Sequence, residues 1–370
     1  MVKTFFNIFN ILINLLFVAL FLLSGLSTQI SPEKFILPAY LGLVFLPLML
    51  INILFVFFWA IKLKWYFVFS LFVLILMYGN IRNDFPLNGS KKNIIAANDT
   101  CTHIKILTYN VKLFDFFKKI KGQDHYNKTV DYILKQNADV VCLQEFGYYN
   151  SDHFLTADNI LSSFDTKYKY HHICYHLNFN NKSTYGVATF SKYPILAKGD
   201  IDYDSKYNHT IYSDIQFKDR IIRLFNCHLE SNQLTFDDKK KMVQLVDSTS
   251  KKNFSETTGV LTRKLGAAYR RRAHQADMVD KEIKKSPYEV IVCGDFNDTP
   301  ISYAYKKVRG NLSDVFVNTS SGLGISYNEL PFLYRIDYIF HSKTLSAGMF
   351  KVDKEKLSDH YPVSCVINLN

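Results

Sequence analysis

The sequence predicts a mixed α/β fold, with two packed sheets and helices outside them, that follows an all-α membrane segment. Apolar stretches fill the first 80 residues, whereas short strand patterns and helical patterns follow one another from residue 103 onward. Several of these strands lie close together with short turns between them, which indicates antiparallel pairing. Strand pairs wrapped by helices in this order favour two mixed sheets in one domain.

Residues 1–82 are predicted to form a membrane anchor. Residues 5–26 and 36–60 are uncharged and largely apolar, and each meets the length of roughly 20 residues that a spanning helix needs. The shorter stretch at 65–78 reaches that length only if it runs from 63 to 81, so we expect two to three transmembrane helices. A signal peptide at the start is disfavoured, because its apolar core would be too long and a second apolar stretch follows.

Basic residues beside the apolar stretches indicate the orientation. Lys3 precedes the first stretch, and Lys62 and Lys64 follow the second, whereas Lys34 in the loop between them stands beside Glu33. We therefore expect the N-terminus in the cytoplasm and the C-terminal domain on the extracytoplasmic side of an integral membrane protein. If the third stretch does not span, the C-terminal domain is cytoplasmic instead.

Composition separates the rest of the chain into a linker and one domain. Residues 83–102 are rich in polar residues and form the predicted linker, and residues 103–370 are long enough for a single domain with a large core. The formal net charge is +11, of which residues 1–82 supply +4. The remaining positive charge suits an anionic substrate or a contact with anionic lipid. The six cysteines show no CxxC or Cys/His metal spacing.

Apolar alternation predicts strands, and apolar residues at helical spacing predict helices. Helical spacing is clear at 125–136, where Tyr126, Val130 and Ile133 recur three to four residues apart. Pro300 favours a helix that begins at about residue 302, because proline is common at helix starts. In chain order, the predicted strands are 103–109, 139–143, 168–176, 186–191, 211–217, 221–227, 289–293, 335–340 and 361–369, and the predicted helices are 125–136, 237–249, 258–284 and 302–309.

Polar residues follow several predicted strands at the point where each strand ends. Asp295, Asp337 and Asp359 supply carboxylates, Asn297 a carboxamide and His360 an imidazole. Carboxylate and carboxamide oxygens suit a hard divalent cation, and an imidazole beside it can act as an acid or a base. The set predicts metal-assisted cleavage of a phosphate ester.

Six short motifs occur in a recognisable order. They are Tyr109-Asn110, Gln144-Glu145, Asn226-x-His228-Leu229, Gly294-Asp295-Phe296-Asn297, Arg335-Ile336-Asp337-Tyr338 and Ser358-Asp359-His360. The order resembles the endonuclease/exonuclease/phosphatase superfamily, which includes pancreatic-type deoxyribonucleases, abasic-site endonucleases, sphingomyelinases and inositol phosphatases. The resemblance covers residues 104–367 and implies a four-layer α/β/β/α sandwich that depends on Mg²⁺ or Mn²⁺.

The resemblance implies a metal held mainly by Glu145, with Asn110 and Asp359 beside it. Taken alone, Glu145 could be a solvated strand end, Asn110 a turn residue and Asp359 a helix cap. The order of the motifs favours the metal site.

The predicted catalytic residues are His228, Asp295, Asn297, Asp337 and His360. A carboxylate bonded to one imidazole nitrogen fixes the tautomer and raises the basicity of the other nitrogen, so Asp337 would orient His360. Asp295 and Asn297 are two residues apart, so on an extended segment both would point to the same side, toward the attacking water and the phosphoryl oxygens. The resemblance makes His228 a donor to phosphate oxygens, although a lone histidine in an apolar strand is more often a core residue.

Three further residues are predicted to contact the substrate. Arg270 and Arg271 belong to a basic run that is either a solvated helix face or a nucleic-acid groove. Tyr185 resembles an active-site tyrosine of the abasic-site endonucleases, but it directly precedes Gly186, whereas theirs precedes a Ser-Gly pair. The Trp-Cys-Asp-Arg block of the inositol phosphatases is missing at residues 334–338.

These observations predict a membrane-anchored, metal-dependent phosphodiesterase that acts on nucleic acid. One alternative is a related enzyme acting on a phospholipid or another small phosphorylated headgroup. The other is a non-catalytic, membrane-tethered binding module, which the intact set of acidic residues and histidines disfavours. The lipid bilayer is an expected partner, and no protein partner is predicted.

Overall fold

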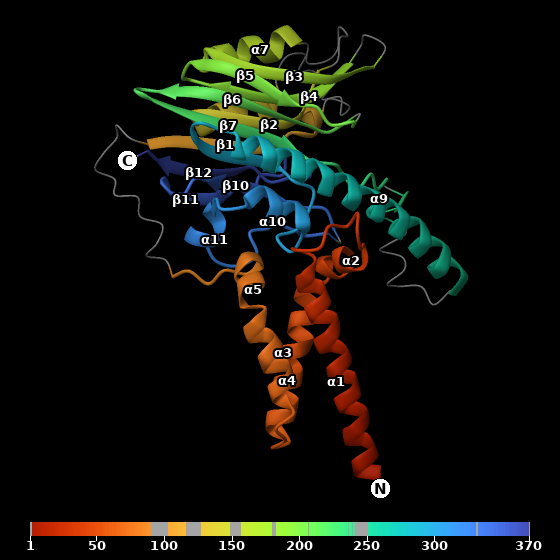
Figure 1. Cartoon of the computed structure of the whole chain (residues 1–370). Helices are drawn as coiled ribbons and strands as arrows, with labels where there is room; N and C mark the ends of the chain where they lie inside the picture. The colour runs from red at the N-terminus through yellow and green to blue at the C-terminus, as the bar shows by residue number, and fades with distance from the viewer. Residues whose placement is uncertain are drawn as a thin grey trace.

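The computed structural model describes residues 2–89, 103–115, 127–148, 157–179, 183–205, 207–235, 237–238, 240, 251–330 and 332–369. Its N-terminal part consists of α1 (Val2–Leu26), α2 (Leu37–Leu43), α3 (Phe45–Ile61), α4 (Phe67–Leu76) and α5 (Tyr78–Asp84). These helices form a narrow group that projects from a broader body of sheets and covering helices (Figure 1). We call residues 2–84 the anchor.

The anchor contains one unbroken helix, Phe5–Leu26, that is long and apolar enough to cross a membrane. Two further pairs of helices pass the same test only if each pair counts as one broken span: α2 with α3, bent by 74°, and α4 with α5, bent by 64°. By length and composition, the described residues therefore provide one crossing, or up to three.

The bend between α2 and α3 has a local cause. The sequence predicts one continuous stretch at 36–60, but the helix breaks at Val44. Pro47 has no N–H to donate to the carbonyl of Leu43, so an unbroken helix would lose this hydrogen bond. The Leu43 carbonyl accepts a hydrogen bond from the hydroxyl of Tyr334 instead, at 3.3 Å.

Polar side chains connect the anchor helices to one another. Asn14 Nδ2 donates to Ser70 Oγ at 2.6 Å, and Ser70 Oγ donates to Asn52 Oδ1 at 3.0 Å. Trp59 Nε1 donates to Asn14 Oδ1 at 3.0 Å. All four side chains are buried, so their hydrogen bonds hold α1, α3 and α4 together in one arrangement. Apolar contacts alone would distinguish this arrangement poorly from other packings of the three helices.

The body is a sandwich of two six-stranded mixed sheets. The first has the order β11-β12-β1-β2-β4-β3 and the second β5-β6-β7-β8-β10-β9. The first sheet contains β1 (His103–Asn110), β2 (Val140–Phe146), β3 (Tyr170–Phe179), β4 (Ser183–Ser191), β11 (Ser346–Val352) and β12 (Val363–Asn368). The second contains β5 (Ile195–Ile201), β6 (His209–Phe217), β7 (Arg220–His228), β8 (Glu289–Asp295), β9 (Ser313–Asp314) and β10 (Asp337–His341).

Three apolar layers hold the sandwich together. Ile106, Leu224 and Ile291 belong to the cluster between the two sheets. On the first sheet lie α6 (Lys128–Gln136) and α7 (Ala157–Asp165), and on the second lie α9 (Lys251–Lys284) and α10 (Tyr303–Arg309). The short elements η2 (Lys112–Asp115) and α11 (Val315–Thr319) complete the body. This arrangement confirms the predicted four-layer α/β/β/α sandwich.

Most predicted elements are present, with shifted ends. The predicted helix at 125–136 begins at Lys128, because the Asn127 side chain accepts hydrogen bonds from the backbone N–H groups of Thr129 and Val130. The strand predicted at 335–340 begins at Asp337. The predicted helix at 237–249 and the predicted linker after residue 89 lie largely outside the described residues.

The anchor packs directly on the sandwich. Ser27 Oγ donates to the Ile301 carbonyl at 2.7 Å, and the Tyr40 hydroxyl donates to the Thr262 carbonyl at 2.7 Å. A Cβ atom on Gly42 would lie 2.5 Å from the Ile301 carbonyl oxygen, so only glycine permits this close approach. The anchor and the sandwich therefore share an interface made of specific hydrogen bonds and close backbone packing.

Candidate active site

Strand register brings the polar strand ends to one edge of the sandwich. β1 and β2 run parallel, and Asn110 pairs with Gln144 at their ends. β7 and β8 also run parallel and bring His228 beside Asp295. The antiparallel strand β10 then places Asp337 opposite Asp295.

Asp337, His360 and Asp295 form a buried chain of polar side chains. Asp337 Oδ2 lies 2.9 Å from His360 Nδ1, and His360 Nε2 lies 3.6 Å from Asp295 Oδ2. Burial lowers the pKa of His360, but the Asp337 and Asp295 carboxylates outweigh burial and raise this pKa to about 10. Burial raises the pKa of Asp295 to about 7. The geometry matches the predicted pairing of Asp337 with His360.

Glu145 lies on the other side of Asp295, and Asn110 bridges the two. Asn110 Nδ2 donates to Glu145 Oε1 at 3.2 Å and to Asp295 Oδ2 at 3.0 Å. The Tyr185 hydroxyl is hydrogen-bonded to Glu145, so the structure brings this tyrosine into the site. Burial and the charge of Asp359 raise the pKa of Glu145, which is the expected response to excess negative charge.

Asp359 is paired with a lysine that the sequence did not single out. Lys112 Nζ lies 2.9 Å from Asp359 Oδ2 and 3.4 Å from Glu329 Oε1. Burial and Asp359 raise the pKa of Glu145, and the charge of Lys112 offsets part of that rise. A signal was present in the sequence, because Lys112 follows Asn110 by two residues in the turn after the first strand.

His228 is buried and neutral. Its Nε2 atom lies 4.0 Å from Glu145 Oε1 and 3.9 Å from Asp295 Oδ2. Burial lowers the pKa of His228 to about 3. Asn208 Nδ2 lies 3.3 Å from His228 Nε2, and the Tyr185 ring centroid is 6.2 Å from the His228 ring. Asn208 is a second contributor that sequence reasoning missed, since it lies in a loop without a recognisable motif.

Asn297 lies in the site, but its backbone conformation differs from the expected one. Its backbone N–H donates to Asp295 Oδ1 at 2.8 Å, and its Nδ2 donates to Asp295 Oδ2 at 3.2 Å and to the Leu229 carbonyl at 2.9 Å. The φ angle of Asn297 is +53°, so the segment is a left-handed turn. The expectation of an extended segment is therefore wrong, although the two side chains do lie together.

Arg270 and Arg271 on α9 are not among the described residues that line the cleft over Glu145 and His360. Arg271 Nη1 pairs with Glu230 Oε1 at 2.9 Å, and Arg270 lies on the side of α9 that faces Tyr40 of the anchor. Arg272 is fully buried, where Nη2 donates to Asn232 Oδ1 at 2.8 Å and Nη1 donates to the Asn297 carbonyl. The run thus supplies a structural arginine and two surface arginines.

The oxygen-rich side of the site fits a hard cation. Glu145 and Asp359 repel each other's charge, whereas Asn110 turns its amide nitrogen toward Glu145 and its Oδ1 toward the backbone N–H of Lys112. Mg²⁺ prefers oxygen ligands, so the carboxylates of Glu145 and Asp359 would hold it, with Asn110 beside them. Asp295, Asp337 and His360 also place potential ligand atoms within 4.8 Å of one another, but there Asp337 and His360 already bond each other.

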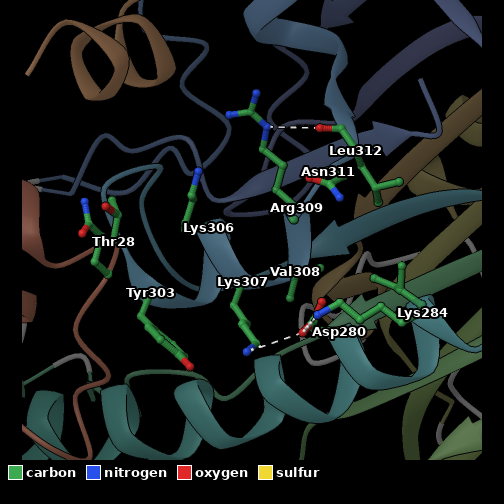
Figure 2. A pocket seen from close by; sticks show the side chains of 13 residues that line it. Thr28, Asp280, Lys284, Tyr303, Lys306, Lys307, Val308, Arg309, Asn311 and Leu312 are labelled. Carbon is green, nitrogen blue, oxygen red and sulfur yellow. Dashed lines mark hydrogen bonds and ion pairs between the residues drawn. The ribbon is translucent and has the colours of Figure 1, made fainter.

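A cleft of about 220 Å³ opens over these residues. Glu145, Asn297, Asp359 and His360 line its polar part. A second cavity, of about 540 Å³, lies between α9, α10 and the loop after α1, and is lined by Thr28, Lys284, Lys306, Lys307 and Arg309 among others (Figure 2). In this second cavity Lys284 and Lys307 pair with Asp280. No histidine is among the described residues that line this second cavity.

Comparison with known families covers most of the chain. Residues 107–360 match the Endonuclease/Exonuclease/phosphatase family, and residues 4–83 match a domain of unknown function. Functionally curated proteins give no match.

Solved structures share the sandwich. An endonuclease/exonuclease/phosphatase from Beutenbergia cavernae is 14% identical, with a TM-score of 0.51, over 73% of this chain and 72% of its own. A humanized D. rerio TDP2 carrying 14 mutations is 17% identical, with a TM-score of 0.47, over 72% of this chain and 99% of its own. Sphingomyelinase C from Streptomyces griseocarneus is 18% identical, with a TM-score of 0.48, over 72% and 99%. The family match and the two-sheet architecture show that the chain belongs to the endonuclease/exonuclease/phosphatase family.

Proposed function

We propose that the protein is a membrane-anchored, divalent-metal-dependent hydrolase of phosphodiesters, with its catalytic domain on the extracytoplasmic side. Members of its family hydrolyse phosphoester bonds. The observation that carries the proposal is the convergence on one cleft of two groups of side chains. Glu145, Asn110 and Asp359 make up the oxygen-rich group, and the Asp337–His360 pair lies across Asp295 from it.

Each group has a defined task in this mechanism. A bound Mg²⁺ or Mn²⁺ would neutralise phosphate charge as a Lewis acid. Asp337 holds His360 Nδ1, which leaves Nε2 facing Asp295, so this pair and Asp295 position the attacking water and move its proton. Neutral His228 stabilises charge that develops on the phosphoryl oxygens, and Asn297, whose amide donates to Asp295 and to the Leu229 carbonyl, holds Asp295 in place.

Nucleic acid is the substrate that the sequence favours. The positive charge of the catalytic domain supports it, but the predicted contacts Arg270 and Arg271 are not among the described residues that line the cleft, and Arg271 pairs with Glu230. A non-catalytic binding module would have no need for the Asp337–His360 hydrogen bond. Hydrolysis of a phosphodiester is therefore the proposed function.

The first test uses the full chain in detergent with bis(p-nitrophenyl) phosphate, a soluble diester, with Mg²⁺, with Mn²⁺ or with EDTA. We expect metal-dependent release of p-nitrophenol. Replacing His360 with Ala lowers kcat by about 100- to 10,000-fold, because a proton-transfer group is lost. Glu145→Gln lowers the affinity of the protein for the metal, so a higher metal concentration is needed for the half-maximal rate.

Asp219→Asn is the matched control for the loss of a carboxylate, because Asp219 is exposed in the turn between β6 and β7. Its rate should equal that of the unmodified protein. A His360→Ala protein that is folded and keeps most of the activity would contradict the proposed mechanism.

A further inference from the structure

The anchor contributes a wall to the catalytic cleft. Leu43, the last residue of α2, lines the cleft together with Glu145 and His360. The break before Pro47 leaves the Leu43 carbonyl without its helical partner, and the Tyr334 hydroxyl donates to it at 3.3 Å. Tyr334 also lines the cleft. The anchor is therefore part of the site as well as a tether.

A second contact fixes α2 at this position. The Tyr40 ring meets the ring of Tyr269, another cleft residue, edge to face with 5.9 Å between centroids. The Tyr40 hydroxyl donates to the Thr262 carbonyl at 2.7 Å. Contacts to both Tyr269 and Tyr334 hold Leu43 at the cleft.

The cleft is divided by polarity. Leu43 lies with Leu234, Leu265 and Phe332 among its apolar lining residues, whereas the catalytic carboxylates and His360 form its polar part. Asn232 and Gln233 add uncharged polar groups. Among the described lining residues there is no lysine or arginine, and Lys112, which lies beside the cleft, is paired with Asp359. A diester with an apolar substituent gains by burying hydrocarbon on this lining. A nucleic acid strand brings further phosphates and gains nothing from leucine side chains, because its phosphates are bound mainly by basic groups.

The loop beside Leu43 exposes apolar side chains. Leu330 is 74% exposed and Leu333 is 42% exposed, and they flank Phe332 of the cleft. Val44, next to Leu43 on the anchor, is 40% exposed. Apolar side chains that gather beside a membrane helix are typical of a surface that enters the lipid interface. If the anchor crosses a bilayer, the apolar end of the cleft therefore lies beside the bilayer surface from which the anchor emerges.

We propose that the substrate is a lipid phosphodiester that enters the cleft from the bilayer, with hydrocarbon along Leu43 and Phe332 and phosphate at Glu145 and His360. This inference rests on the proposed phosphodiesterase function. In the reaction the oxygen of water bonds to phosphorus and one P–O ester bond breaks. The proton of water ends on the leaving alcohol, so no oxidant or further reactant is required.

The test compares two substrates on the full chain. One is bis(p-nitrophenyl) phosphate, and the other is lipid in vesicles of phosphatidylethanolamine, phosphatidylglycerol, phosphatidylcholine and sphingomyelin, with products identified by mass spectrometry. Leu43→Gln should lower kcat/KM for the lipid at least tenfold and change the rate on the soluble diester less than twofold. Leu43→Val, which keeps an apolar side chain, should retain most of the lipid activity.

Leu37→Gln is the matched control, because Leu37 begins the same helix but does not line the cleft. It should leave both activities unchanged. Equal losses on both substrates in Leu43→Gln would show that Leu43 only supports the fold, and would overturn the proposed role.

A third substrate, supercoiled plasmid, separates the remaining outcomes. Metal-dependent nicking that is lost in His360→Ala, without lipid cleavage, would overturn the lipid substrate and keep the phosphodiesterase. Absence of activity on the soluble diester, the lipids and the plasmid, from folded protein with metal, would overturn the proposed function itself.

Discussion

Three residues of the candidate active site have strained backbone conformations. Lys112, Glu145 and Asn297 all have positive φ angles, between 46° and 53°, although none is glycine. Such conformations cost about 1 kcal/mol or more each and persist where the surrounding structure imposes them. At Glu145 the strand register shifts between Leu143 and Phe146, which is how a strand residue is turned toward Asn110.

The motif residues were predictable because their types carry chemistry. Asp337 and His360 were paired from the sequence alone, and the two atoms lie at hydrogen-bond distance. Lys112 and Asn208, which contact Asp359 and His228, were not predicted, because a lysine or asparagine in a loop has many equally common uses. The basic run that contains Arg270 and Arg271 does not reveal that the next residue, Arg272, is buried.

Arg272 gives a prediction for stability. Its guanidinium connects the Asn232 side chain, the Asn297 carbonyl and Asp298, whose carboxylate lies 3.4 Å away. Arg272→Leu leaves the buried Asp298 unpaired, so we expect a loss of about 3 to 5 kcal/mol in the free energy of unfolding. The free energy of unfolding is measured by urea titration in detergent, with far-UV circular dichroism as the signal. Arg270→Leu, at an exposed position on the same helix, should cost less than about 0.5 kcal/mol. Equal losses would refute the role given to Arg272.

Hydropathy alone does not determine how the anchor helices bend or which polar residues pair between them. Apolar length predicts where α1, α3 and α4 occur, but not that the second and third stretches bend by 74° and 64°. The partners of the buried polar residues were also not predictable, because Asn14 and Ser70 are 56 residues apart. Only the packed helices bring them together.

The polar cluster gives a prediction at this scale. Asn14→Leu removes the hydrogen bonds to Ser70 and Trp59, and should destabilise the packing of α1 against α3 and α4 by about 0.5 to 2 kcal/mol. Disulfide crosslinking between cysteine pairs introduced in α1 and α4 measures this change. In Asn14→Leu the crosslinks should form faster, or between more pairs of positions, than in the unmodified protein. Asn10→Leu is the control, because Asn10 bonds only the Phe6 carbonyl of its own helix. Unchanged crosslinking in Asn14→Leu would show that the cluster does not hold the helices.

For the whole molecule, the sequence established two parts but not how they join. Each part carries its own pattern: apolar length for the anchor, and ordered motifs for the sandwich. The junction depends on pairs such as Tyr40 with Thr262 and Leu43 with Tyr334, which are more than 200 residues apart. No periodicity in the sequence reports such pairs. The consequence for function is large, because the junction forms one side of the catalytic cleft.

The arrangement of the anchor also predicts the topology. Lys62 Nζ lies 4.9 Å from the Phe6 ring centroid, so the turn after α3 lies beside the beginning of α1, at the end of the anchor far from the sandwich (Figure 1). If each bent pair is one span, three crossings separate this basic end from the catalytic domain. Basic residues beside membrane spans are enriched on the cytoplasmic side, so we expect the catalytic domain outside.

Reporter fusions test this topology in bacterial cells. Alkaline phosphatase joined to the C-terminus should be active, because it folds only where its disulfides form, and green fluorescent protein at the same point should be dark. Alkaline phosphatase fused after Lys64, at the basic end, should be inactive and serves as the internal control. An inactive C-terminal phosphatase with a fluorescent C-terminal fusion would place the catalytic domain in the cytoplasm. In that case the α4–α5 pair would not cross, and the lipids within reach of the cleft would be those of the inner leaflet.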